Sequence, residues 1–162
     1  MRRLIAIIAV CLIGVTAANA QTYSKAIGVE GGWEGVGLTF KQFTTSGRAF
    51  MDYKAQIDFW NGNFGALASA TYDFNKHIGN DFHFFYGFGA EAGFFMGQFA
   101  GKKYGGDVMA GAFANIGLEY DFTGIPFALS VDWNPGLRLI LGRDFGLAFS
   151  GKALCMGVKV TF

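Results

Sequence analysis

Strict alternation of apolar and polar residues runs through most of this chain, and no other feature constrains its fold as much. From 108 to 122 every even position is apolar, whereas the odd positions include Asn115, Glu119 and Asp121. Successive side chains of a β-strand point to opposite faces of a sheet, so this segment is predicted to be a strand with one apolar and one polar face. The same alternation predicts seven further strands, at 25–33, 36–43, 49–59, 64–74, 82–94, 125–134 and 154–162.

Short turns between these segments determine how the strands pair. Glu34-Gly35 and Asn61-Gly62 suit two-residue hairpin turns, and Ser46-Gly47 is a candidate for a third. A hairpin centred on Ile78 and a turn at 123–126 complete the set. The polar pairs that result are Lys41 with Asp52, Asp58 with Gly65, Asp73 with His83, and Glu119 with Ser130. Apolar residues also meet apolar residues, which supports the strand assignment because a one-residue slip would reverse every face.

Composition indicates that the apolar faces point outward. Charged residues make up 15% of the chain, where about 25% is usual, and hydrophobic residues make up 52%. The polar faces are rich in glycine, which suits a narrow interior, and the apolar faces are together too large to fit inside eight strands. We therefore expect an all-β fold, an eight-stranded antiparallel transmembrane β-barrel of the up-and-down type with a polar lumen. A soluble secreted barrel with an apolar interior is the alternative.

Aromatic residues near the predicted strand ends fit the two interfaces of a membrane. Trp33 and Trp60 precede one set of turns. The aromatic residues expected at the opposite rim are Tyr72, Phe74, Tyr120, Phe122 and Phe162. Backbone groups in lipid must all be hydrogen-bonded, and strands achieve this only in a closed sheet.

The first twenty residues have the layout of a secretory signal peptide. Arg2 and Arg3 precede an apolar run at 4–15, and Ala18-Asn19-Ala20 forms a cleavage site. We expect residues 1–20 to be removed and residues 21–162 to form one barrel domain. Without Arg2 and Arg3 the 13 basic residues become 11, against 12 acidic ones, so nothing favours nucleic acid as a partner.

An Ala-x-Ala signal, eight alternating strands and a terminal aromatic residue resemble the small outer-membrane barrels of Gram-negative bacteria. OmpX-like proteins and the barrel part of OmpA-like proteins are the nearest comparison. The resemblance implies insertion into the cell outer membrane among its lipid and glycolipid. It also implies that the barrel-assembly machinery reads the terminal strand, with Val158, Val160 and Phe162 as the signal. We expect a monomer.

The predicted lumen carries a polar network. Its members are Glu30, Lys41, Asp52, Lys54, Asp58, Asp73, His83, Glu91, Glu119, Asp121, Asp132 and Lys159, with Arg48 and Arg138 as further inward candidates. Isolated charges are costly to bury, so these groups should pair or hold water. They form either a plugged, hydrogen-bonded interior or a polar path for small solutes, and the plug is favoured because small barrels are generally filled by side chains.

No catalytic or cofactor site is expected. The predicted pair of Asp73 and His83 supplies two members of a hydrolase triad, but Ser69 lies two residue pairs away and the histidine faces inward. A structural ion pair is therefore the favoured interpretation. Two histidines and the cysteine Cys155 do not make a convincing metal site.

Two longer loops, near 97–106 and 142–151, are expected to face outside. Lys102, Lys103, Tyr104 and Arg143 could contact glycolipid phosphates or an adhesion partner, and solvated loop residues are the alternative. The sequence thus predicts a non-enzymatic outer-membrane protein with an envelope-structural or surface-interaction role. A small pore for small or apolar solutes, as in OmpW-like barrels, is the alternative function.

Overall fold

The computed structural model describes residues 23–33, 35–59, 64–79, 81–99, 102–142, 145–150 and 154–162. The expected signal peptide, Trp60, the turn at 61–62 and Arg143 lie outside these residues. The described parts of the chain contain strands and turns and no helix. Accordingly, none of them includes a helix with the length and hydropathy required to span a bilayer.

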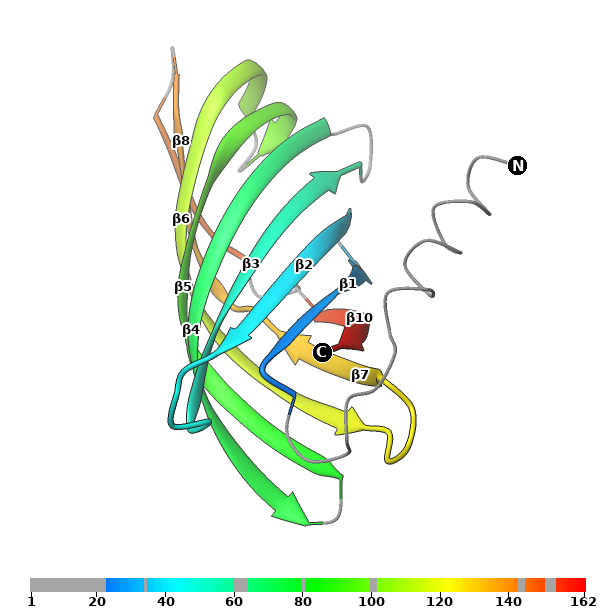
Figure 1. Ribbon diagram of the computed structural model, residues 1–162. Coiled ribbons are helices and arrows are strands. Elements are labelled where there is room, and N and C mark those ends of the chain that lie inside the picture. Colours follow the sequence, from blue (N-terminus) through cyan, green and yellow to red (C-terminus); the bar gives the residue numbers. More distant parts are fainter. Residues whose placement is uncertain are drawn as a thin grey trace, which may run out of the picture.

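Within the described residues, ten strands make up one sheet (Figure 1). They are β1 (Lys25–Gly32), β2 (Gly35–Phe43), β3 (Ala49–Asp58), β4 (Phe64–Gly79), β5 (Phe82–Phe99), β6 (Lys102–Asp121), β7 (Phe127–Trp133), β8 (Gly136–Leu141), β9 (Gly146–Ser150) and β10 (Leu154–Thr161).

Antiparallel pairing closes the sheet in a ring of eight strands. The strands β1 to β7 pair in sequence order, and β10 joins β7 to β1. The two remaining strands, β8 and β9, extend the sheet beside the upper part of β6. Figure 1 shows β4, β5 and β6 as a tall wall opposite the shorter β1, β2, β7 and β10. We call the end with Lys25 and Phe162 the terminal end of the ring, and the opposite end the far end.

The extra strands arise where the sequence predicted one strand and a loop. Pro135 separates β7 from β8, although both pair with β6. Proline has no backbone N–H and therefore interrupts the ladder. The predicted loop near 97–106 is largely the end of the β5–β6 hairpin, and the predicted loop near 142–151 contains β9, so both loop predictions were too long.

The register confirms three of the predicted polar pairs and corrects the fourth. Lys41 lies opposite Asp52, Asp58 opposite Gly65, and Glu119 opposite Ser130. The pairing of Asp73 with His83 was wrong: Asp73 lies opposite Gly87, and His83 lies opposite His77. The reason is that β4 continues to Gly79, whose φ of 135° allows the chain to turn there.

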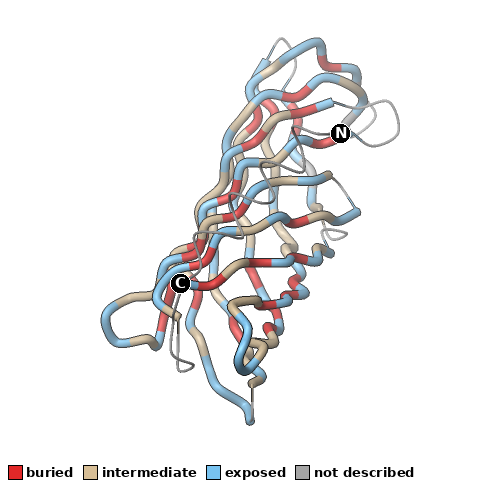
Figure 2. The backbone as a smooth tube through the Cα atoms, turned by 45° about the vertical axis from the view of Figure 1, so that its right-hand side comes forward, coloured by how far each residue is buried: buried red, intermediate tan, exposed pale blue. Residues whose placement is uncertain are grey.

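Polar side chains point into the ring and apolar side chains point out of it. Asp73 is 0% exposed, whereas Leu38 is 62% exposed and Phe88 is 64% exposed. Figure 2 shows this as buried and exposed residues alternating along the strands. Arg48 is an exception to the expected set of inward residues: it is exposed at the turn before β3, and Phe50 is buried instead. Two consecutive buried residues, Ala49 and Phe50, break the alternation there.

Close backbone packing makes Gly87 sensitive to a single methyl group. A Cβ at this inward position would collide with the Tyr72 carbonyl oxygen and with Asp73. Gly87→Ala should therefore lower the free energy of unfolding by about 1–3 kcal/mol, measured by urea titration in detergent micelles. Gly105→Ala is the matched control because a Cβ there would meet nothing within 4 Å. Equal stability of the two variants would contradict the packing described.

Candidate functional site: the polar interior

Glu119 holds two lysines at the terminal end of the interior. Lys41 Nζ lies 2.5 Å from Glu119 Oε1, and Lys159 Nζ lies 3.6 Å from Glu119 Oε2. Lys159 also donates a hydrogen bond of 2.8 Å to Ser130 Oγ, and the Tyr23 hydroxyl donates to Glu119. Burial and the Glu119 carboxylate raise the pKa of Tyr23 well above its ordinary value, so the hydroxyl keeps the proton that it donates.

Four aromatic rings surround the ammonium group of Lys41. Its Nζ lies 3.8 Å from the centroid of Phe50, 4.7 Å from Phe43, 5.5 Å from Tyr23 and 5.6 Å from Phe85. Cation–π attraction is strongest where the cation has lost its water, and Lys41 is 1% exposed. Lys41, Glu119 and these rings together fill the ring at its terminal end.

A second ion-pair cluster crosses the middle of the interior. Lys54 Nζ donates to Glu30 Oε1 at 2.7 Å and to Asp132 Oδ2 at 3.0 Å. Asn134 Nδ2 donates to the same Asp132 oxygen at 2.8 Å. We call Glu30, Lys54, Asp132 and Asn134 the Lys54 cluster. Its side chains come from β1, β3, β7 and the β7–β8 junction, so it connects strands on different sides of the ring.

Two buried aspartates receive hydrogen bonds from neutral donors. The Thr39 hydroxyl donates to Asp52. Thr71 Oγ1 donates to Asp73 at 2.6 Å, and Asn115 Nδ2 lies 3.0 Å from both oxygens of that carboxylate. Asp73 therefore accepts its hydrogen bonds from neutral side chains and is not the partner of His83.

The far end of the interior changes from charged to apolar. Arg138 binds Glu91 in a bidentate arrangement, with Nε 2.5 Å from Oε1 and Nη2 3.3 Å from Oε2. Nearby, Asp58 accepts a 2.6 Å hydrogen bond from Gln56. Beyond these residues lies a buried apolar cluster of Leu67, Phe95, Tyr104, Met109 and Ile140.

The predicted outer-loop residues separate in the structure. Tyr104 was expected on an exposed loop, but it is 6% exposed and its ring packs 6.3 Å from that of Phe95. The correction follows from the register shift between Phe95 and Met96, where Gly106 has a φ of 109°. This bulge turns Tyr104 to the buried face, although even-numbered residues further along β6, such as Val108, are exposed. Lys103 is exposed on the same strand. Lys102 begins β6 with a side chain outside the described residues, and Arg143 lies outside them altogether.

His83 lies apart from the main network, near the tip of the β4–β5 hairpin. Its Nε2 lies 3.4 Å from Asp121 Oδ2, and its Nδ1 lies 3.3 Å from Asn75 Nδ2. The His77 ring is 4.9 Å away. Within the described residues, no group of three or more His, Cys, Asp or Glu side chains is arranged to hold a metal ion.

One small polar cavity lies between the Lys54 cluster and the Glu91–Arg138 pair. Its volume is about 30 Å³, which accommodates about two water molecules. The residues lining it are Glu30, Lys54, Gln56, Ser69, Glu91, Phe113, Asn134, Gly136, Arg138, Ser150 and Cys155.

The sequence analysis did not identify the large apolar side chains that point into the ring, although glycines on the neighbouring strands indicate where they lie. Phe85 lies opposite Gly117, Phe95 opposite Gly65, and Leu67 opposite Gly93. A Cβ on Gly117 would collide with the Phe85 ring. Glycine on one strand thus makes room for a large side chain on its neighbour, and this complementarity could have been read once the register was known.

Comparison with known proteins identifies no relative of this chain. No protein-family model matches it, and no curated protein or solved structure is significantly similar to it.

Replacement of Lys54 should destabilise the folded protein, because two buried carboxylates would lose the ammonium group that they bind. Lys54→Met leaves Glu30 and Asp132 without a cation, so we expect the free energy of unfolding to fall by about 3–5 kcal/mol. The exposed Lys103→Met variant is the control and should change stability by less than about 0.5 kcal/mol. Urea titration in micelles measures both, and a Lys54→Met variant as stable as the control would contradict the ion-pair network.

Proposed function

We propose that this chain is an integral outer-membrane protein, an eight-stranded transmembrane β-barrel with a side-chain-filled lumen. The observation that carries the proposal is the reversed distribution of polarity. The interior holds the ion pairs described above, while Val29, Leu38 and Phe88 are among many large apolar residues exposed outside. An apolar surface that surrounds the ring would promote aggregation in water but suits lipid.

Closure of the sheet supports the same proposal. Pairing of β1 with β10 gives both strands partners on either side. A bilayer core offers no water to backbone N–H and C=O groups, so spanning strands require this kind of closure.

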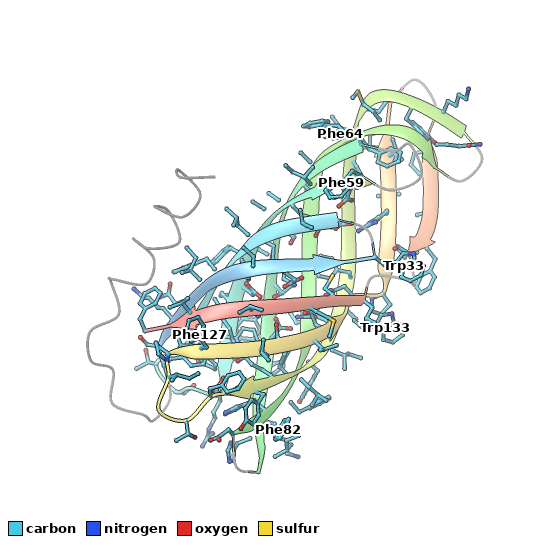
Figure 3. All side chains as sticks on the ribbon, turned by 90° about the vertical axis from the view of Figure 1, so that its right-hand side faces the viewer. Trp33, Phe59, Phe64, Phe82, Phe127 and Trp133 are labelled. Atoms are coloured by element: carbon cyan, nitrogen blue, oxygen red, sulfur yellow. The ribbon has the colours of Figure 1, made fainter. Side chains whose placement is uncertain are left out.

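Aromatic residues at the two ends of the ring support the same proposal. Figure 3 shows Phe82 and Phe127 toward one end, and Trp33, Trp133, Phe59 and Phe64 toward the other. Trp33 and Phe59 are more than half exposed. In the proposed orientation the terminal end faces the periplasm and the far end faces outside.

The terminal strand suits a role in assembly. Lys25 N donates to the Phe162 carbonyl oxygen at 2.9 Å, and Phe162 N donates back to Lys25 O at 2.8 Å. The side chains of Val158 and Phe162 nevertheless stay 47% exposed on the outside. We propose that the barrel-assembly machinery reads Val158, Val160 and Phe162 before β10 closes on β1, after removal of residues 1–20 during export.

A filled lumen favours a non-enzymatic role in envelope structure or surface interaction, with outer-membrane lipid and glycolipid as partners of a monomer. Lys41 with its surrounding aromatic rings, and the Lys54 cluster, both lie across the path that a solute would take. The alternative is a small pore for apolar solutes, which the buried apolar cluster at the far end favours. In that case, the polar clusters below it would have to move.

Conductance in a planar bilayer distinguishes these two roles. The protein should be electrically silent after insertion has been verified by protease protection, because ion pairs and rings fill the lumen. A large porin in the same bilayer serves as the positive control. Steady ohmic steps from the inserted protein would contradict the filled lumen and support the pore.

A further inference from the structure

Acidic and basic residues are distributed differently between the inside and the outside of the ring. Of the 12 acidic residues in the chain, all but Glu34 and Asp144 are described, and none of the described ones is exposed. By contrast, several basic residues have exposed side chains. Among the described side chains, these are Lys25, Arg48, Lys76 and Lys103. The described outer surface therefore carries positive charges without acidic neighbours.

Three of these basic residues lie at the terminal end of the ring. Lys25 begins β1, Arg48 directly precedes β3, and Lys76 lies near the end of β4. Because β1 to β4 are neighbours in the sheet, all three lie on one side of the ring (Figure 1). Asn75 N donates a 2.8 Å hydrogen bond to the Arg48 carbonyl oxygen, so Arg48 lies beside the part of β4 that carries Lys76. We call Lys25, Arg48 and Lys76 the basic collar.

The two lysines of the collar share the outward face of their strands with exposed apolar residues. Lys25 lies two positions from Ile27, and Lys76 lies two positions from Phe74, so each pair points to the same side of the sheet. Arg48 is exposed at the turn between β2 and β3. In a bilayer, these positions would place the basic groups at the edge of the apolar surface. Long basic side chains at such an edge extend their charged ends toward the lipid headgroups.

No carboxylate in the described part of the chain forms a salt bridge with the collar. The acidic side chains at this end point inward instead. Glu119 binds Lys41, and Asp121 lies beside His83. The positive charges of the collar are therefore available to a ligand from outside the chain, and electrostatic complementarity requires that this ligand be negative.

We propose that the basic collar binds the headgroup phosphates of anionic phospholipids in the leaflet at the terminal end of the ring. This inference rests on the proposed insertion into a bilayer. The Arg48 guanidinium can bind a phosphate in a bidentate arrangement, and the two lysines bind as point charges. A zwitterionic lipid carries an ammonium group beside its phosphate, which the collar repels. An anionic phospholipid lacks that group, so the collar selects lipids by the net charge of the headgroup.

The test is the selectivity of the inserted protein for spin-labelled lipids. The protein is reconstituted in phosphatidylcholine bilayers that contain a trace of spin-labelled phosphatidylglycerol or of spin-labelled phosphatidylcholine. Electron paramagnetic resonance then measures the fraction of each labelled lipid whose motion is restricted by contact with the protein. We expect phosphatidylglycerol to associate about two- to threefold more strongly at low salt, since each basic residue near the headgroups adds attraction.

Charge-neutralising variants localise the preference. Lys25→Gln, Arg48→Gln and Lys76→Gln should each lower it, and the triple variant should remove most of it. Lys103→Gln is the matched control, because it removes the same single charge from the far end and should retain the preference. Equal loss in Lys103→Gln and Lys76→Gln would mean that net charge alone sets the preference and would overturn the assigned site.

The same spectra separate failure of the collar from failure of the proposed function. Restricted lipid in equal amounts with both labels would show that the protein contacts bilayer lipid without selecting it, which would refute the collar alone. No restricted lipid with either label would refute insertion into the bilayer, and the collar with it.

Discussion

Pairing of β1 with β10 is the interaction on which the remaining structure depends. Seven residue pairs, from Ala26 with Thr161 to Gly32 with Cys155, join the two ends of the sheet. This closure satisfies the backbone groups of both strands and also creates the interior. Glu30 on β1 reaches Lys54 on β3, which also binds Asp132 on β7, only because the sheet curves back on itself.

Within the closed ring, oppositely charged side chains pair in some regions, and large side chains pack against glycines in others. Ion pairs dominate the terminal end and the middle, where low local dielectric strengthens each contact and penalises each unpaired group. Apolar rings fill the remaining space, and glycines on neighbouring strands make room for them, as Gly117 does for Phe85. The interior is thus specified by matched neighbours across strands rather than by any single segment.

The sequence predicted the eight strands of the ring, their polar and apolar faces and most polar pairs, because alternation and turn residues are local signals. It did not predict β8 and β9. It did not predict where β4 ends, so His83 was assigned to Asp73 although Asp121 is its acidic neighbour. The true partner of Asp73, Gly87, lies four residues beyond His83. Because four is an even number, the wrong register still placed every side chain on the correct face of the sheet. Contacts across the bore, such as Lys54 with Asp132, depend on curvature and side-chain reach, which no local pattern encodes. The inward position of Tyr104 likewise became evident only with the bulge at Gly106, which exchanges the two faces of β6 at that point.

The direction of the apolar faces toward lipid is the central claim, and paramagnetic lipid tests it most directly. Methyl NMR spectra of the protein in bilayer nanodiscs would be recorded with and without a nitroxide at the end of the acyl chain. Methyl signals of the outward residues Leu38, Leu137 and Val158 should broaden strongly, whereas those of the inward residues Thr39 and Thr71 should keep their intensity. Equal broadening of both sets, or stronger broadening of the threonines, would contradict an apolar exterior embedded in lipid.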